Sequence, residues 1–361
     1  MQDILTCAMG LDIHRDVIVA CLAKGELGAD PEIEIRSFST LIPEMRKLRD
    51  WVLEAECHHV AMESTGIYWQ PIYEMLEPCF DGQISILVVN ARHMKNVPGR
   101  KTDMRDAQWI ATLLRAGLLK GSFIPDKTFR ELRHLTRYRK SIVHDITAQK
   151  NRIDKFLQSS GFRFTAFLSD AFGASGRNII RHLMEYGSIS REALDRCLKT
   201  QTRKRIDEIL IALNGSLSEH QRNFLRMIFG HLEALEQHRH TVEDAITEEI
   251  TKHEEALRLL CSIPGIDVTA AAAIIAEIGT DMSAFPDSQH ICSWAGLSPG
   301  NNESAGKRKS AHINKGNPYL KSMLCEVGWV ISGKRTLHLS GWYWNCLLYT
   351  SDAADDLIGV D

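Results

Sequence analysis

Apolar residues in the first third of the chain recur with two different periods. Short apolar runs with the length and composition of buried strands occur at residues 7–22, 59–63 and 84–89. Apolar side chains repeat at helical spacing in residues 41–53, 68–76 and 102–119. Strands that alternate with helices in this way predict an α/β domain with a buried sheet.

The middle of the chain has a longer helical repeat. Residues 130–157 and 232–260 carry apolar side chains at the a and d positions of a heptad pattern. The two runs predict a long antiparallel hairpin or a dimerising coiled coil, and ordinary core helices of a bundle explain the pattern equally well.

A tight turn follows at Pro264 and Gly265, before an alanine-rich helix, and together they predict a helix-hairpin-helix unit. Backbone N–H groups at such a turn can anchor a nucleic-acid phosphate. A close-packed helical corner that needs small residues is the alternative.

Composition narrows the class of protein. A chain of 361 residues with 44% hydrophobic content can bury a sizeable core over two or three domains, and its formal net charge of -3 means that any nucleic-acid surface must be local. The nine cysteines show no zinc-type spacing and are expected to be reduced thiols. We find neither a signal peptide nor an apolar run of membrane-spanning length, so we expect a cytoplasmic protein with no membrane partner.

Four acidic residues lie at positions that structural roles alone do not readily explain when the four are taken together. Asp12 interrupts an apolar strand, Glu63 ends another, and Asp103 and Asp106 lie three residues apart in the first turn of a helix. Taken singly, each would ordinarily be structural or solvated. Together they predict a site for Mg²⁺, which prefers oxygen ligands and can assist phosphodiester displacement. Asp16 lies in a predicted turn and is left out.

Basic residues are dense and acids sparse from residue 92 to residue 155. Tyr138 and His134 are interleaved with these cations, which favours a phosphate-contacting face whose affinity depends on salt; a solvated helix face is the alternative. The nucleic-acid contacts that we expect in this segment are Arg100, Lys101, Arg105, Arg133, Arg137 and Lys140.

Residues 294–317, here named the serine loop, are rich in Gly, Asn and Ser. Ser304 precedes the basic run Lys307, Arg308 and Lys309, where cations could balance the charge of a phosphate attacked by a serine oxygen. A serine in such a loop is ordinarily a solvent-facing residue, and that alternative stays open.

Five motifs in fixed order resemble the transposases of insertion-sequence family 110. They are G-L-D, M-E-S-T-G, K-T-D-M-R-D-A, I-P-G-I and G-L-S-P-G-N-N-E-S-A-G-K-R-K-S, and the similarity covers about residues 8–335. The resemblance implies a DEDD-type recombinase with an N-terminal RuvC-like (RNase H-like) α/β domain, long coiled-coil helices and a mainly α-helical C-terminal domain. We therefore expect domains at residues 1–125, 126–258 and 259–340, with an atypical tail at 341–361.

The same resemblance implies the roles of individual residues and partners. Asp12, Glu63, Asp103 and Asp106 would hold Mg²⁺, and Ser304, in E-S-A-G, would form a transient phosphoserine bond with cut DNA, with Ser310 as the second choice. A structured bridge RNA would select donor and target DNA. The site would join two domains, across the subunits of a homodimer or homotetramer.

The chain departs from the family pattern after about Arg335, and we interpret its tail as foreign to the fold, from a truncated or chimeric reading frame. Two other functions fit the same residues. One is a Mg²⁺-dependent junction nuclease that uses only the carboxylates and water, and the other is a non-catalytic scaffold that binds nucleic acid.

Overall fold

The computed structural model describes residues 3–64, 66–79, 85–90, 106–298, 302–304, 307–310, 313, 315–334 and 336–345, with the backbone alone at 302–304 and 307–310. The chain divides into two compact units, residues 1–124 and residues 125–361. Across the described helices, none is long and apolar enough to cross a membrane.

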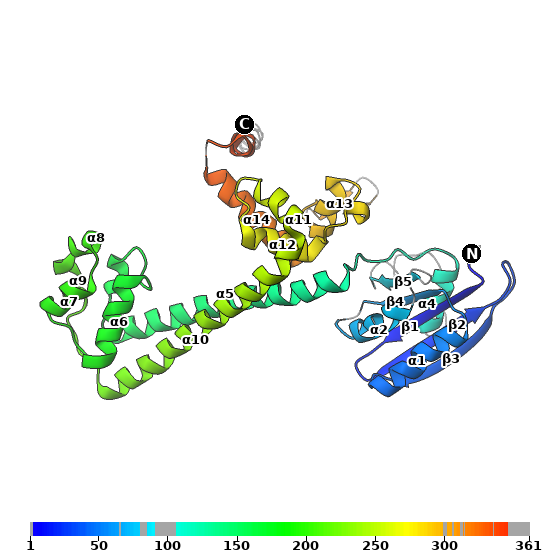
Figure 1. Ribbon diagram of the computed structural model, residues 1–361, viewed down its shortest axis with the longest axis horizontal. Coiled ribbons are helices and arrows are strands. Elements are labelled where there is room, and N and C mark those ends of the chain that lie inside the picture. Colours follow the sequence, from blue (N-terminus) through cyan, green and yellow to red (C-terminus); the bar gives the residue numbers. More distant parts are fainter. Residues whose placement is uncertain are drawn as a thin grey trace. The chain divides into compact units, whose positions relative to one another are not determined.

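The first unit is built on one mixed sheet (Figure 1). Its strands are β1 (Cys7–Ile13), β2 (Val17–Lys24), β3 (Glu32–Ser39), β4 (His59–Glu63) and β5 (Ser85–Val89). They lie in the order β3-β2-β1-β4-β5, with β1, β4 and β5 parallel and β2 antiparallel to both of its neighbours. This confirms the predicted α/β class and is compatible with an RNase H-like fold. The sequence pattern missed β3, an edge strand whose residues are mostly exposed or half-buried.

Helices cover both faces of this sheet (Figure 1). The helices are α1 (Ile42–Glu54), α2 (Trp69–Leu76), followed by a 3-10 turn (Glu77–Cys79), and α4 (Asp106–Arg115). Because side chains alternate along a strand, Met9, Leu11 and Ile13 pack in one core with α1 and α2. Ala8 and Ala61 pack with α4 on the opposite face. The apolar periodicity therefore located α1 and α2 correctly. Helix α4 matches the third predicted helix from residue 106 to residue 115, but residues 116–119, also predicted as helical, form a turn and a loop.

Helix α4 is held close to β1 at two points. A Cβ atom added to Gly10 would lie 2.2 Å from the carbonyl oxygen of Ala107 and 2.4 Å from the backbone nitrogen of Ala111, so only glycine admits the helix at this distance. At the other end of α4, the buried Arg115 side chain donates to the carbonyl oxygens of Leu5 (3.0 Å) and Glu26 (2.7 Å). These contacts fix both the position and the direction of α4 on the sheet.

The second unit contains two long helices, α5 (Lys127–Ser159) and α10 (Glu219–Ile250), which pack along each other. Arg139 contacts Glu243 near one end and Phe156 contacts Phe224 near the other, so the pair is antiparallel. Buried Gln149 on α5 donates a 2.6 Å hydrogen bond to the carbonyl oxygen of Ile228 between these contacts. This is an antiparallel hairpin within one chain; dimerisation through these helices stays a prediction.

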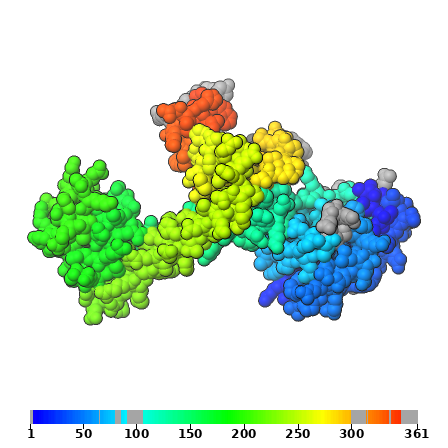
Figure 2. Space-filling model, in the orientation of Figure 1, coloured from blue at the N-terminus to red at the C-terminus, as the bar shows by residue number. Residues whose placement is uncertain are grey.

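Short helices connect α5 to α10 and share one apolar core with them. They form the compact green mass in Figure 2. Their bounds are a 3-10 turn (Phe164–Phe167), α6 (Ala174–Tyr186), α7 (Arg191–Cys197), α8 (Thr200–Arg203) and α9 (Ile206–Ala212).

The remaining helices form one group, in which α12 contacts α5, α11 and α14, and α13 contacts α14. They are α11 (Glu254–Cys261), α12 (Val268–Ile278), α13 (Ser288–Ala295) and α14 (Pro318–Gly333), with 3-10 turns at Thr251–His253 and Met282–Ala284. Strands β6 (Asn302–Ser304) and β7 (Lys307–Ser310) form a small hairpin between α13 and α14.

The start of the atypical tail contacts α14. Residues 338–345 are helical, and the Trp344 indole donates a 3.0 Å hydrogen bond to the carbonyl oxygen of Ser332. Residues 346–361 lie outside the described residues, so for them the tail hypothesis stays a prediction.

Candidate active site

Two of the predicted carboxylates are neighbours on the sheet. Leu11 of β1 pairs with Met62 of β4 in parallel register, so the next residues, Asp12 and Glu63, occupy adjacent positions. Neighbouring strands are about 4.8 Å apart, and paired residues point to the same face. That face is the α4 face, because Asp12 alternates with Leu11, which packs toward α1 and α2. The Asp12 side chain is 14% exposed, and its Oδ2 lies 3.2 Å from Nε2 of His14.

Asp106 reaches the same edge of the sheet from α4. The carbonyl oxygen of Arg115, at the end of this helix, accepts hydrogen bonds from the backbone N–H groups of Ile4 and Leu5, just before β1. Helix α4 therefore runs antiparallel to β1. Its first residue, Asp106, lies toward the end of β1 that carries Asp12. Asp12 and Glu63 thus lie on adjacent strands, and Asp106 begins the helix that covers the same face of the sheet.

The fourth carboxylate, Asp103, lies outside the described residues. Among the residues that are described, no three His, Cys, Asp or Glu side chains are grouped closely enough to hold a metal ion. The chemistry of the donor set still suits a hard cation, because Asp12, Glu63 and Asp106 offer only carboxylate oxygens.

Arg133 and Arg137 of the expected basic face have partners inside the protein. Glu277 of α12 is 2% exposed, and its carboxylate accepts two 2.8 Å hydrogen bonds from Arg137. Arg133 is 14% exposed, and its Nε lies 3.1 Å from the same carboxylate. Burial lowers the pKa of Arg133 to about 10, against the opposing effect of Glu277, so this guanidinium is still charged at neutral pH. Charge density along the sequence does not reveal that these cations neutralise a buried acid.

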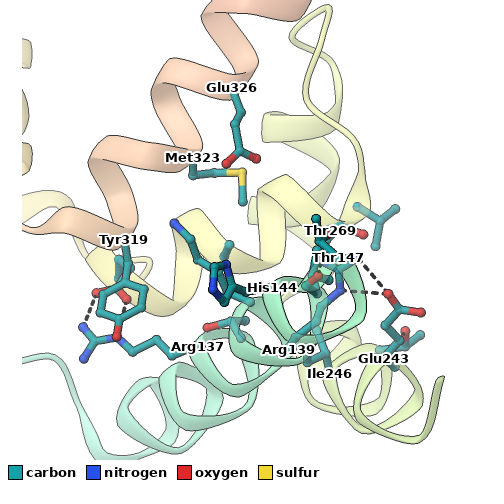
Figure 3. A pocket seen from close by; sticks show the side chains of 17 residues that line it. Arg137, Arg139, His144, Thr147, Glu243, Ile246, Thr269, Tyr319, Met323 and Glu326 are labelled. Carbon is teal, nitrogen blue, oxygen red and sulfur yellow. Dashed lines mark hydrogen bonds and ion pairs between the residues drawn. The ribbon is translucent and has the colours of Figure 1, made fainter. Parts of the chain in front are cut away.

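Lys140 is an exposed residue of α5, and its ammonium lies 5.7 Å from the Tyr319 ring centroid. Arg137 stacks on the same ring at 4.3 Å, beside a cavity of about 540 Å³ between α5, α10, α12 and α14 (Figure 3). The other three expected contacts in this segment, Arg100, Lys101 and Arg105, lie outside the described residues.

The predicted helix-hairpin-helix turn joins α11 to α12. Gly265 has a φ of +93°, and a Cβ atom added to it would lie 2.8 Å from Cγ1 of Ile331 on α14. Pro264 is exposed. The turn therefore packs against a third helix, as the helical-corner alternative predicts, and its contact with phosphate stays a prediction.

Ser304 is the last residue of β6, paired with Lys307 of β7 across a two-residue connection. Ser310 pairs with Asn302 at the opposite end of the hairpin. The hairpin therefore separates the two candidate nucleophiles along its length. Lys307, Arg308 and Lys309 all belong to β7, and their side chains lie outside the described residues.

The ends of the serine loop are closed by residues that were not among the predicted site residues. The Asn317 backbone N–H donates a 2.8 Å hydrogen bond to the carbonyl oxygen of Trp294. A Cβ atom added to Gly316 would lie 2.1 Å from the nitrogen of Gly296, so the two ends of the loop touch. The Asn317 Nδ2 donates a 2.6 Å hydrogen bond to Glu277. A single acid within the apolar sequence A-A-A-A-I-I-A-E-I-G is the signal that could have revealed Glu277.

Two family models match this chain. Residues 9–161, which include all four predicted carboxylates, match a DEDD transposase model of the IS110 group, and residues 257–342, which include the serine loop, match the model described as transposase IS116/IS110/IS902 family.

Two curated proteins are similar over most of the chain. A Sinorhizobium fredii protein named as a candidate transposase, y4qE, is 23% identical over 247 residues, which are 66% of this chain and 51% of that protein. An uncharacterized 43.6 kDa protein of insertion element IS110 from Streptomyces coelicolor is 28% identical over 243 residues, 61% of this chain and 58% of that protein. The chain thus spans little more than half the length of each. Because both family models name the same group and together match most of its residues, the chain belongs to the IS110 family of transposases.

Proposed function

We propose that this chain cuts and rejoins DNA strands at the ends of an insertion sequence, with acidic residues that hold Mg²⁺ and Ser304 as the nucleophile. The observation that carries the proposal is the adjacency of Asp12 and Glu63 on paired strands, on the face of the sheet that is covered by α4 with Asp106 as its first residue, within the part of the chain that matches a DEDD transposase. Carboxylates on adjacent strands repel each other, which favours a role that a cation would satisfy.

The residues that would hold Mg²⁺ are Asp12, Glu63, Asp106 and Asp103. When bound, the ion would neutralise charge on the phosphate and polarise the phosphorus for attack. The protein contributes the orientation of the carboxylates: the register of β1 with β4 sets two of them, and the close approach of α4 to Gly10 sets the third.

The serine chemistry conserves the number of phosphoester bonds at each step. Attack of the Ser304 Oγ on phosphorus forms a phosphoserine ester, while the displaced deoxyribose oxygen leaves and takes up the proton that serine loses. Attack on this ester by the hydroxyl of another strand joins the strands and returns the proton to Ser304. No external energy source is needed, since one ester bond is formed for each ester bond broken. The cations of β7 would balance the phosphate charge.

The partners in this proposal are donor and target DNA and a structured bridge RNA. The RNA rests on the resemblance to the family, while exposed Lys140 and the basic residues of β7 support contact with nucleic-acid phosphates in general. Assembly of a homodimer or homotetramer would bring the serine of one subunit to the carboxylates of another.

Ser304→Ala tests the nucleophile. In the presence of Mg²⁺, DNA from the element's end and its flanking transcript, wild-type protein should form a covalent protein-DNA species that is visible on a denaturing gel. Ser304→Ala should reduce this species roughly a thousandfold or more, because no other hydroxyl replaces the attacking oxygen.

The matched control is Ser310→Ala, at the other end of the same hairpin, which should keep the adduct. DNA that is nicked by Ser304→Ala as fast as by wild-type protein, with no adduct in either, would instead identify a nuclease that uses water. Binding without cleavage by either protein would favour the scaffold.

A further inference from the structure

The carboxylate of Glu277 connects elements that are far apart in the chain. It contacts Arg133 and Arg137 of α5 and also Asn317, at the end of the serine loop. A carboxylate that is 2% exposed is costly to bury unless it is fully paired, so these contacts act as one unit.

Asn317 holds the end of the loop through its backbone N–H and through both polar atoms of its side-chain amide. Its backbone N–H bonds Trp294, at the beginning of the loop. Its side-chain Oδ1 caps α14 by accepting from the backbone N–H groups of Tyr319 (3.0 Å) and Leu320 (3.1 Å). Its Nδ2 then has Glu277 as acceptor at 2.6 Å, which fixes the rotation of the amide.

The other end of the loop reaches the same cluster. The Arg133 guanidinium lies 5.7 Å from the Trp294 ring centroid and donates a 2.9 Å hydrogen bond to the carbonyl oxygen of Ala276. Arg133 thus contacts the residue that begins the loop, while Glu277 contacts the residue that ends it. Both ends of the serine loop are therefore connected to α5 through one ion-pair cluster.

We propose that Glu277 is a positioning residue, which sets the base of the serine loop relative to α5 so that Ser304 is presented to DNA in one orientation. The effect on rate rests on the proposed function of Ser304; the effect on the base of the loop does not. A loop base that is held by charge-assisted hydrogen bonds loses little entropy when DNA binds. Misplacement of the attacking serine by about 1 Å can slow its attack by on the order of 100-fold.

The test exchanges the hydrogen-bond donor and acceptor by replacing each of the two residues with one of nearly the same size. Glu277→Gln leaves one oxygen where two accept from Arg137 and Asn317, and it removes the charge that strengthens these hydrogen bonds. Asn317→Asp places a carboxylate against Glu277 and removes the donor, so each change alone weakens or removes the hydrogen bond. The double variant Glu277→Gln/Asn317→Asp restores it with the roles reversed, because the introduced glutamine can donate to the introduced aspartate. The aspartate still caps α14, and the cluster keeps its net charge.

Two measurements are made on the full-length variants: hydrogen exchange of the backbone amide at position 317, and the rate of adduct formation at saturating DNA. Each single variant should exchange faster and form adduct about 10- to 100-fold more slowly, with DNA affinity unchanged, and the double variant should recover to within about threefold. Glu243→Gln, which removes the Arg139 ion pair in the same cavity, is the control and should change neither (Figure 3).

The proposal is overturned if the single variants keep wild-type exchange at position 317, or if the double variant recovers neither exchange nor rate. If wild-type protein forms no adduct but exchange follows the expected pattern, the serine chemistry is wrong and the positioning of the loop base stands.

Discussion

Gly10→Ala should destabilise the first unit by about 3 kcal/mol or more, the effect expected when a methyl group meets backbone that cannot move aside. The added Cβ would lie 2.2 Å from the carbonyl oxygen of Ala107, and α4 must shift to admit it. Such a shift displaces Asp106 from the edge that carries Asp12 and Glu63, so DNA cleavage should fall together with stability. Urea unfolding followed by circular dichroism measures the change in unfolding free energy.

Gly230→Ala is the control for this prediction, because nothing lies within 4 Å of its added Cβ on an exposed part of α10. The same chemical change should there raise stability by roughly 0.5–1 kcal/mol, since alanine is the better helix former. Equal unfolding free energies for Gly10→Ala and wild-type protein would mean that α4 does not press on β1 as described.

Asp12→Asn should abolish DNA cleavage, by about a thousandfold or more, while leaving the unfolding free energy unchanged or raised. The asparagine has nearly the same shape, but it carries no charge for a cation and relieves repulsion with the carboxylate at the adjacent strand position. Initial rates of strand cleavage at saturating Mg²⁺, together with urea unfolding, measure both quantities.

Asp16→Asn is the matched control. The Asp16 side chain is 86% exposed and lies 3.7 Å from Arg15, outside the paired residues of β1, so cleavage should be unaffected. Loss of activity in both variants would indicate that cleavage depends on the overall negative charge near the end of β1, and would contradict a specific role of Asp12.

The sequence predicted those parts of the fold that depend on local periodicity. Helices α1 and α2 followed from apolar spacing, because each buries a single face, and α5 covers the first predicted heptad run at residues 130–157. The second run, residues 232–260, spans the end of α10 and most of α11, so the start of α10 at Glu219 was missed. Strand β3 was missed because only long apolar runs were interpreted as strands, although its sequence E-I-E-I-R-S-F-S alternates polar and apolar residues as a half-buried edge strand does. The choice between a hairpin within one chain and a coiled coil between chains depends on tertiary contacts that periodicity does not encode.

For the candidate site, the sequence indicated the residue types but not their partners. Asp12 and Glu63 were visible because acids interrupt or end apolar strands, yet their adjacency follows from the parallel register of β1 with β4, a long-range pairing. Arg133 and Arg137 looked like a free basic face, since the acid that neutralises them, Glu277, lies 140 residues from Arg137 along the chain. Charge density along a sequence therefore overstates the surface available to phosphate when one buried acid gathers several cations.

The central claim is that Asp12 and Glu63 act on one metal ion, and metal binding tests it more directly than any rate. Electron paramagnetic resonance of Mn²⁺, titrated into protein saturated with DNA from the element's end, counts bound ions without requiring catalysis. We expect at least one site in wild-type protein and in Asp16→Asn, and loss of that site, or weakening by on the order of 10- to 100-fold, in both Asp12→Asn and Glu63→Gln. Equal Mn²⁺ affinity in all four proteins would contradict the account.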